Sequence, residues 1–143
     1  VYTDKDGLKK NPYIIHRTSI GCYERTLALL IEKYAGALPL WLAPEQVRGL
    51  PISEKQNDAV AEAGRRLKEA GFRAEADWRN EKIGYKIREA QMDKIPYMLV
   101  IGDREAQSGA VSVRSRSGGD LGVMPLDEFV ARAKEEVETK AIH

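Results

Sequence analysis

Apolar residues recur along the chain with two different periods, one typical of helices and one typical of strands. Segments of the two kinds follow one another in turn, and this order predicts an α/β fold. Apolar residues that recur every three or four positions predict helices, while residue-by-residue alternation or a short apolar run predicts a strand. The predicted strands cover residues 13–16, 46–52, 72–78, 97–101 and 110–116. The predicted helices cover residues 23–35, a segment that opens at 53–56, residues 83–94 and a last segment that begins near residue 125.

The order of the elements after residue 45 predicts a mixed sheet. They follow one another as β-α-β-α-β-β-α, which gives about four or five strands covered by three helices. The two crossovers through helices suit parallel pairing, so the sheet is expected to be mostly parallel. The strand at 110–116 is expected to add an antiparallel edge. Gly102-Asp103 and Gly118-Gly119-Asp120 are expected to be turns.

The helix starts and faces are predicted in more detail. Ser53 and Gln56 have the spacing of a capping box, and Pro125 suits the first turn of the last helix. The apolar faces of the three helices after residue 52 are predicted to be Val60, Gly64, Leu67 and Gly71; then Ile83, Ile87 and Ala90; then Leu126, Phe129, Val130, Ala133 and Val137.

A stretch rich in proline and large apolar residues, 38–44, has no helical period and is interpreted as a linker that packs. We therefore expect two units. The first, residues 1–40, holds one strand and one helix, and the second, residues 41–143, holds the α/β domain. Four apolar side chains near the first unit are expected to form an exposed patch or to pack on the second unit: Leu27, Leu30, Ile31 and Trp41.

Composition narrows the class of protein. The chain has 23 basic and 22 acidic residues, so its net charge of +1 neither favours nor excludes nucleic acid. A single cysteine, Cys22, cannot form an intrachain disulfide and favours an intracellular, cytoplasmic protein. No apolar run approaches the ~20 residues that a membrane helix needs. Because the chain begins with Val1 and shows no signal-peptide pattern, we expect it to be a piece of a larger protein.

The segment 79–94 is the first candidate site. It holds five basic residues and begins at the end of a strand, where open α/β sheets bind ligands. The helix start offers free N–H groups to phosphate; Arg88 could hold a phosphate or base edge with two hydrogen bonds, and Lys94 could act as a point charge. Asn80 has the donors and the acceptor that base reading needs. The alternative interpretation is a solvated amphipathic helix of mixed charge.

A second candidate site lies on the strand at 110–116. Arg114 and Arg116 share one face of it, with Arg104 and Glu105 at the preceding turn. Two arginines on one sheet face suit an anionic ligand, and a glutamate among them can accept hydrogen bonds from base amino or imino groups. The alternative is an edge strand whose charges prevent aggregation.

The first unit contains His16, Cys22 and Arg25, but no complete site. Two candidate ligands cannot close a zinc site, which takes at least three protein ligands, so a structural histidine and a small thiol are the simpler interpretation. The sequence contains no Ser/His/Asp arrangement, P-loop or GxGxxG motif. The chain alone is therefore not predicted to be an enzyme.

The same residues resemble a known family. Residues 15–39, IHRTSIGCYERTLALLIEKYAGALP, resemble the third signature motif of class II aminoacyl-tRNA synthetases. The later stretches DWRNEKIGYKIREAQMDKIPYMLVIGDRE and VSVRSR resemble the C-terminal region of bacterial threonyl-tRNA synthetases. The resemblance covers nearly the whole chain. It implies a class IIa anticodon-binding domain preceded by a strand–helix remnant of the catalytic domain.

The resemblance also implies roles for particular residues. Asn80, Arg88, Lys94, Glu105 and Arg114 match the family residues that contact the anticodon loop of threonine tRNA. Glu105 and Arg114 would be the main base readers, with Asn80 assisting, while Arg88 and Lys94 would hold the backbone or bases.

Three further residues match the catalytic part of the family. His16 matches one of three zinc ligands, Arg25 an ATP-binding arginine, and Cys22 stands near the substrate where serine is common. Zinc, Mg and ATP are thus implied for the parent enzyme, a homodimer, and no cofactor for this chain alone, whose own oligomeric state stays open.

The leading hypothesis is a module that recognises the threonine tRNA anticodon and has no membrane or DNA partner. The parent enzyme would use ATP to attach threonine to that tRNA. One alternative is a stand-alone relative that acts as an interaction or accessory subunit. Another is a small α/β enzyme that binds a phosphorylated metabolite at residues 80–85.

Overall fold

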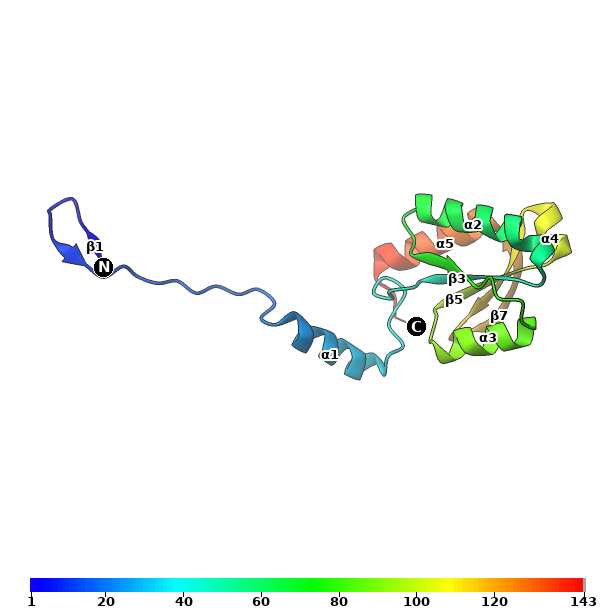
Figure 1. The fold of residues 1–143 in the computed structure, drawn as a ribbon, viewed down its shortest axis with the longest axis horizontal. Coiled ribbons are helices and arrows are strands. Elements are labelled where there is room, and N and C mark those ends of the chain that lie inside the picture. The colour runs from blue at the N-terminus through cyan, green and yellow to red at the C-terminus, as the bar shows by residue number, and fades with distance from the viewer. Residues whose placement is uncertain (143) are drawn as a thin grey trace.

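A five-stranded mixed sheet forms the centre of the chain in the computed structural model, which describes residues 1–142 (Figure 1). The strands lie in the order β4-β3-β5-β6-β7. The first three are mutually parallel, and β6 and β7 are antiparallel to their neighbours. Their bounds are β3 (Val47–Pro51), β4 (Ala74–Ala76), β5 (Tyr97–Ile101), β6 (Ala110–Ser115) and β7 (Gly119–Pro125). The predicted α/β class with a mixed sheet is confirmed.

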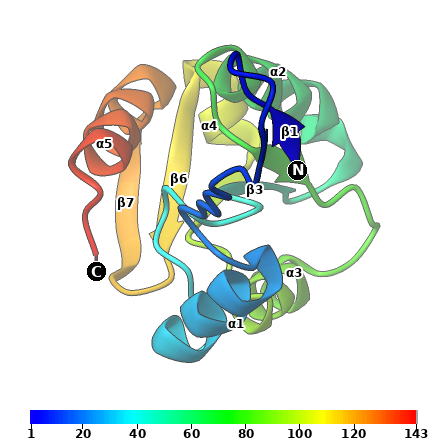
Figure 2. The ribbon, with the colours of Figure 1, turned by 90° about the vertical axis from the view of Figure 1, so that its left-hand side faces the viewer.

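Helices cover both faces of this sheet (Figure 1). The chain steps outward from β3 to β4 and then back past β3 to β5. Because both crossovers join parallel strands and such crossovers are right-handed, their helices lie on opposite faces. These helices are α2 (Asn57–Glu69), which follows the 3-10 turn η1 (Glu54–Gln56), and α3 (Ile83–Met92). The last helix, α5 (Leu126–Thr139), shares the α2 face and lies beside β7 (Figure 2).

Two hydrophobic cores hold the layers together. The larger core joins the sheet to α2 and α5 and includes Val60, Leu67 and Phe129. The smaller core lies under α3 and includes Leu50 and Met98. Successive residues of a strand point to opposite faces of the sheet. Neighbouring residues of β5 or β6 therefore belong alternately to the α2 face and to the α3 face.

The local signals of α2 and α5 are confirmed with one change. The Ser53 backbone N–H donates to the Gln56 side chain over 2.9 Å, as the capping box predicts. The predicted stripe of α5 packs on the sheet. On α2, however, the buried residue between Val60 and Leu67 is Ala63, whereas Gly64 is half-buried and Gly71 lies beyond the helix.

The predicted strand at 13–16 is wrong. The segment is extended but pairs with nothing in the described chain, and Tyr13 and Ile15 are exposed. A short apolar run forms a strand only where another strand supplies hydrogen bonds, and none lies alongside in the described chain. Instead, two short strands, β1 (Tyr2–Thr3) and β2 (Lys9–Lys10), pair as a hairpin near the N-terminus.

Two predictions about the end of the sheet are also wrong. The strand at 110–116 is not an edge, because β7 pairs with its outer side. The predicted turn at 102–103 opens a short helix, α4 (Asp103–Ser108). The sequence hides β7 because Gly119 and Gly122 adopt positive φ angles and a bulge interrupts the register between β6 and β7. Glycine-rich stretches of this kind have low strand propensity.

The N-terminal part stands apart from the sheet (Figure 1). Its helix α1 (Tyr23–Tyr34) buries no residue, and Leu27 and Ile31 are about half exposed. The predicted exposed apolar patch on α1 is therefore present. Trp41 instead lies near the end of α5, with the Lys140 ammonium 5.6 Å from its ring centre. The linker packs as expected, since Leu40 belongs to the larger core; the boundary at residues 40 and 41 stays a prediction.

Candidate functional site

One face of the sheet is only partly covered. Helix α3 packs over β3, whereas the same face of β6 and β7 carries no helix in the part of the chain described, residues 1–142. Arg114 and Ser112 of β6 lie on this face, because they pair with Met98 and Val100 of the α3 core. Val123 of β7 pairs with Ser112 and is 61 % exposed. We call this uncovered area of β6 and β7 the open sheet face.

Arg114 is the charged group of the open sheet face. Its guanidinium donates to Asp120 of β7 across the hairpin, with 3.1 Å between Nη2 and Oδ2. The side chain remains about one-third exposed, so other N–H groups of its planar fork are available to a ligand. The predicted charged guard on an edge strand is excluded, because β6 is an interior strand. Sequence reasoning missed Asp120, although an arginine six residues before an aspartate across a Gly-Gly turn is a hairpin pattern.

Arg116 does not join Arg114 as a ligand-binding pair. Its guanidinium donates to the carbonyl oxygens of Lys94, Ala37 and Leu38 over 2.7, 3.2 and 3.0 Å. Burial lowers the pKa of Arg116. This residue fixes the linker to the sheet domain, and the expected pair of arginines reduces to one.

Glu105 lies at the carboxyl edge of the sheet, on α4. Its carboxylate accepts the Gly102 N–H over 2.9 Å, which closes the start of the helix. It also lines a small cavity of about 120 Å³ with residues of α2, including Ala63 and Arg66. Arg114 lies four residues into β6, roughly 13 Å from that edge at the usual rise per strand residue. Glu105 and Arg114 therefore do not line one pocket, because Glu105 borders the α2 side of the sheet and Arg114 lies on the open sheet face.

The basic residues of the segment 79–94 fall into two groups. Three are already engaged: Arg79 pairs with Asp77 and Glu89, Lys86 is buried, and the Lys94 ammonium donates to the Ala35 carbonyl at the end of α1. The other two, Lys82 and Arg88, are exposed and form no ion pair within residues 1–142. The alternative of a solvated amphipathic helix of mixed charge stays open for the exposed residues of α3, but it does not describe Lys86, which is 3 % exposed.

Lys86 joins the ends of two strands. Its ammonium donates to the carbonyl oxygens of Pro51, at the end of β3, and Asp77, just after β4, over 3.2 and 3.1 Å. A lysine is seldom buried to this degree unless its charge is paired or hydrogen-bonded. Lys86 thus fixes the carboxyl edge of the sheet beneath the loop that carries Asn80.

The loop that presents Asn80 is held by a charged network. Asp77 accepts three hydrogen bonds from Arg79: from the backbone N–H over 3.1 Å, from Nε over 2.9 Å and from Nη2 over 2.6 Å. Glu89 of α3 accepts from the same guanidinium and from the Tyr85 hydroxyl. The Arg79 guanidinium holds the pKa of Asp77 below its usual value. Asn80 is exposed at the tip of this loop.

Replacing Asp77 with asparagine is expected to lower the free energy of unfolding by about 1 kcal/mol at pH 7, since the charge-assisted bonds to a half-exposed arginine are weakened. Because the pKa of Asp77 is depressed in the folded state, its contribution is complete above the unfolded pKa of ~3.9 and is lost as pH falls through the folded pKa. Urea unfolding at pH 7 and pH 2.5 measures both differences. An equal loss at the two values would contradict the assignment.

The three residues matched to a catalytic site do not meet one another. His16, Cys22 and Arg25 are exposed, and the Cys22 thiol donates to Glu24 over 2.8 Å. Within residues 1–142 no group of three or more His, Cys, Asp and Glu side chains is placed to hold a metal ion. The described residues therefore do not fit a zinc site, which needs at least three protein ligands.

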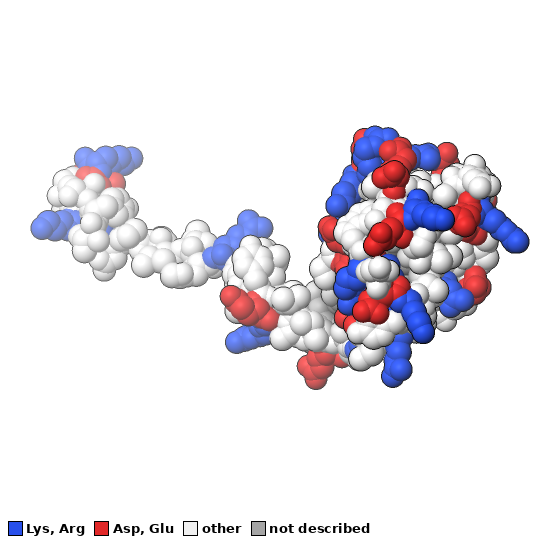
Figure 3. Space-filling view, turned by 45° about the vertical axis from the view of Figure 1, so that its right-hand side comes forward, with Lys and Arg blue, Asp and Glu red and all other residues white. Residues whose placement is uncertain are grey.

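The charges of the sheet domain are mixed over the face that Figure 3 shows, with basic and acidic side chains interspersed. This face therefore carries no large field of one charge sign. No helix in the described residues is long and apolar enough to cross a membrane.

Comparison with known proteins decides the family. Residues 46–136 match the family model described as the anticodon binding domain. The chain belongs to the anticodon-binding domain family. The matched residues begin just before β3 and end within α5, so this domain is the whole sheet with its covering helices.

Relatives of the anticodon-binding domain carry a consistent name. The chain is 59 % identical over 139 residues to threonine–tRNA ligase of Clostridium botulinum and 58 % identical to that of Acetivibrio thermocellus. It matches the C-terminal, anticodon-binding region of threonine–tRNA ligase. Each alignment covers 97 % of this chain and 22 % of the ligase, so the chain spans about a fifth of the length of these relatives.

Solved structures confirm the fold of the anticodon-binding domain. The RNA binding domain of threonyl-tRNA synthetase from Cryptosporidium parvum superposes with a TM-score of 0.74 at 35 % identity, over 78 % of this chain and 28 % of that one. Prolyl-tRNA synthetase from the same organism, complexed with L-proline and AMP, superposes with a TM-score of 0.64 at 27 % identity, over 71 % of this chain and 22 % of that one.

Proposed function

We propose that this anticodon-binding domain reads the anticodon loop of threonine tRNA, as the recognition part of an enzyme that attaches threonine to that tRNA with ATP. The observation that carries the proposal is the open sheet face. This face presents the free N–H groups of the Arg114 guanidinium and the exposed side chain of Val123, and it lies beside helix α3. The domain that carries it belongs to the anticodon-binding family. Names of the relatives support threonine as the amino acid.

The side chains of Arg114, Glu105 and Asn80 have the hydrogen-bonding groups that unstacked RNA bases need. Single-stranded loops are recognised by hydrogen bonds to splayed base edges and by contacts to their flat faces. In the proposal Arg114 donates to a base, Glu105 accepts from a base amino or imino group, and Asn80 does either. Arg88 and Lys94 hold the backbone or bases, and phosphate contacts of this kind position the loop without reading its sequence.

In this proposal the Lys94 ammonium has two possible acceptors, the Ala35 carbonyl and the RNA. It adopts a positive φ of 58° two residues after the end of α3, and its ammonium donates to the Ala35 carbonyl at the end of α1. A lysine side chain is long enough to exchange one acceptor for another, so contact with RNA competes with the Ala35 carbonyl. Its contribution to RNA affinity is therefore smaller than that of Arg88, which makes no such contact.

The proposed enzyme also contains parts that are not in this chain, which spans about a fifth of its relatives' length. ATP, Mg and zinc are its cofactors in the proposal, and a homodimer in the cytoplasm is its form. In the proposal the chain by itself contributes recognition of the tRNA, and the chemical step belongs to the rest of the enzyme. An independent interaction or accessory subunit is not favoured, because the relatives are named as ligases over nearly the full length of this chain.

Titration of the chain with the anticodon stem-loop of threonine tRNA tests the proposal. Binding measured by fluorescence anisotropy is expected to weaken steeply with salt, because counterions are released on phosphate contact. Changing the second or third anticodon base is expected to weaken binding about 5- to 150-fold. This range corresponds to the ~1–3 kcal/mol of binding free energy that one lost base contact costs. Equal affinity for all anticodons would contradict base reading, and affinity that ignores salt would contradict RNA binding through phosphates.

A further inference from the structure

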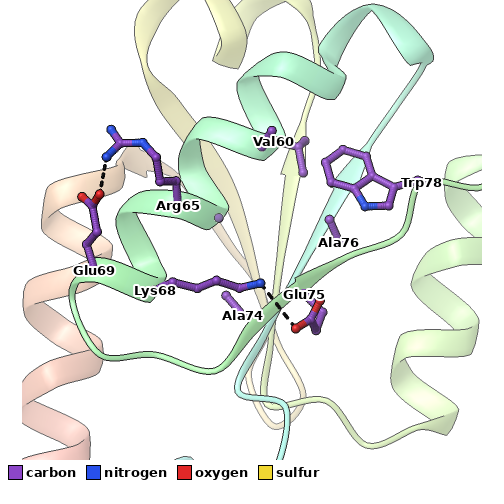
Figure 4. Close-up of a pocket in the computed structure, with 10 residues that line it drawn as sticks. Val60, Arg65, Lys68, Glu69, Ala74, Glu75, Ala76 and Trp78 are labelled. Atoms are coloured by element: carbon purple, nitrogen blue, oxygen red, sulfur yellow. Dashed lines mark hydrogen bonds and ion pairs between the residues drawn. The ribbon is translucent and has the colours of Figure 1, made fainter.

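A groove with a volume of about 550 Å³ runs between α2 and the edge strand β4, away from the open sheet face. The residues that line it include three small ones, Gly64, Ala74 and Ala76. A Cβ atom built on Gly64 would meet no heavy atom within 4 Å, so the notch beside this residue is open space. Figure 4 shows Trp78 at one end of the groove, and this indole is 50 % exposed.

The strand that borders the groove has an unpaired edge. β4 pairs only with β3 in the described sheet. The Asp77 N–H donates to Gly49 of β3 over 3.0 Å, and alternate residues of a strand point their N–H groups to opposite sides. The N–H of Ala76 therefore points away from the sheet. Such an edge can bind one more extended chain, whose alternate side chains enter pockets beside it.

The other side of β4 is an acidic hollow of about 510 Å³, also lined by Trp78. It contains two arginines, Arg48 and Arg79, each shared between two carboxylates. Bonds from Arg79 lower the pKa of Asp77 and Glu89, so both are ionised at neutral pH. The five carboxylates of the hollow are Glu45, Glu75, Asp77, Glu89 and Asp93. These five carboxylates outnumber the two arginines, so the net charge of the hollow is negative even though Glu75 also pairs with Lys68 over 3.4 Å.

We propose that this edge is a docking site for an extended, basic peptide segment of a partner protein. The segment adds to β4, places an apolar side chain in the groove against Trp78, and directs lysine or arginine side chains over the acidic hollow. Charge selects this occupant. The negative hollow repels RNA phosphates, and a second copy paired antiparallel across β4 would place Glu75 near its own equivalent, which is unfavourable. This site lies at the β4 edge of the sheet, away from Arg114 on β6, but borders the loop that presents Asn80, because Asp77, Arg79 and Glu89 line the hollow.

A defined peptide pair tests the proposal on the full chain. The probes are fluorescein-labelled decapeptides of alternating valine with lysine, or valine with glutamate, followed by anisotropy. Gly64→Leu fills the notch in a position where a side chain meets no neighbour and where leucine favours the helix. Its matched control is Ala131→Leu, on an exposed position of α5 outside the groove. Glu75→Lys reverses one charge of the hollow, and its control is Glu128→Lys on α5.

The valine–lysine peptide is expected to bind and the valine–glutamate peptide not to. Gly64→Leu and Glu75→Lys are each expected to weaken binding at least 10-fold, and their controls less than 2-fold. The Ala76 amide is expected to become protected from hydrogen exchange when the peptide binds. The proposal is overturned if neither peptide binds or if both peptides bind equally well. It is also overturned if Gly64→Leu binds the valine–lysine peptide as tightly as the wild type does. Displacement of the peptide by oligouridine overturns it in favour of RNA, and self-association lost in Gly64→Leu overturns it in favour of a second copy.

Discussion

Replacing Lys86 with alanine is expected to lower the free energy of unfolding by about 2–4 kcal/mol. The change removes a buried side-chain stem and leaves the Pro51 and Asp77 carbonyls without their donor. Methionine at position 86 restores most of the packing but not the donors, while it also relieves the cost of burying a charge. Lys86→Met is therefore expected to lose about 1–2 kcal/mol, which places it between alanine and the wild type.

Urea unfolding at neutral pH measures these differences. The matched control is Lys134→Ala, which removes an exposed lysine from α5 and is expected to change stability by less than about 0.5 kcal/mol. Wild-type stability of Lys86→Met would show that the two strand ends do not depend on the ammonium. Amide exchange adds a local measure, since loss of Lys86 is expected to loosen residues 77–82 before the rest of the sheet opens.

The elements that the sequence predicts well are those whose signals are local. The continuous apolar run of β5 marks a central strand, because a strand covered on both faces has no polar side. The capping pair Ser53 and Gln56 fixes the start of η1 and α2 within four residues. The stripe of α5 has a complete helical period. In each case the residues that decide the structure are close together in the sequence.

The elements that the sequence misses depend on distant partners. Residues 13–16, Tyr-Ile-Ile-His, form a short apolar run like that of a strand, yet no strand lies beside them in the described chain. Conversely, β7 contains glycines that argue against a strand, but its hydrogen bonds with β6 hold it in the sheet. Local propensity loses to tertiary pairing in both cases.

The site shows the same limit. Sequence identified Arg114 as a candidate on one face of its strand, and in the structure the neighbouring Val113 points the other way, into the larger core. It could not show that Arg116 is occupied by the linker, that Lys94 is engaged with α1, or that Lys86 is buried. A lysine at a helical position looks the same in sequence whether it faces solvent or two carbonyl oxygens. The choice among five basic residues therefore requires the structure.

Replacing Arg114 with alanine is expected to weaken binding of the anticodon stem-loop by about 1–3 kcal/mol, or roughly 5- to 150-fold, and to reduce discrimination between anticodons. Its guanidinium is held by Asp120 on one side, which orients the remaining N–H groups toward the open sheet face. Lysine at position 114 keeps the charge but not the planar fork. Arg114→Lys is thus expected to retain part of the affinity while losing most of the discrimination.

Glu105 requires a different substitution, because its carboxylate also accepts the Gly102 N–H. Glutamine can accept the same bond, so Glu105→Gln is expected to preserve the helix start and the melting temperature. It replaces one acceptor oxygen with a donor and removes the charge, which should reduce discrimination between anticodons as Arg114→Lys does. The matched control is Arg132→Ala, which deletes an exposed, ion-paired arginine of α5.

These variants separate base reading from general attraction. If Arg114 reads a base, Arg114→Ala narrows the gap between the cognate and changed stem-loops, whereas Arg132→Ala leaves that gap intact and shifts both affinities slightly. A uniform loss for every stem-loop would instead make Arg114 a phosphate contact. If Arg132→Ala weakened binding as much as Arg114→Ala, the open sheet face would have no special part in recognition, and the anticodon would have to be read elsewhere on the domain.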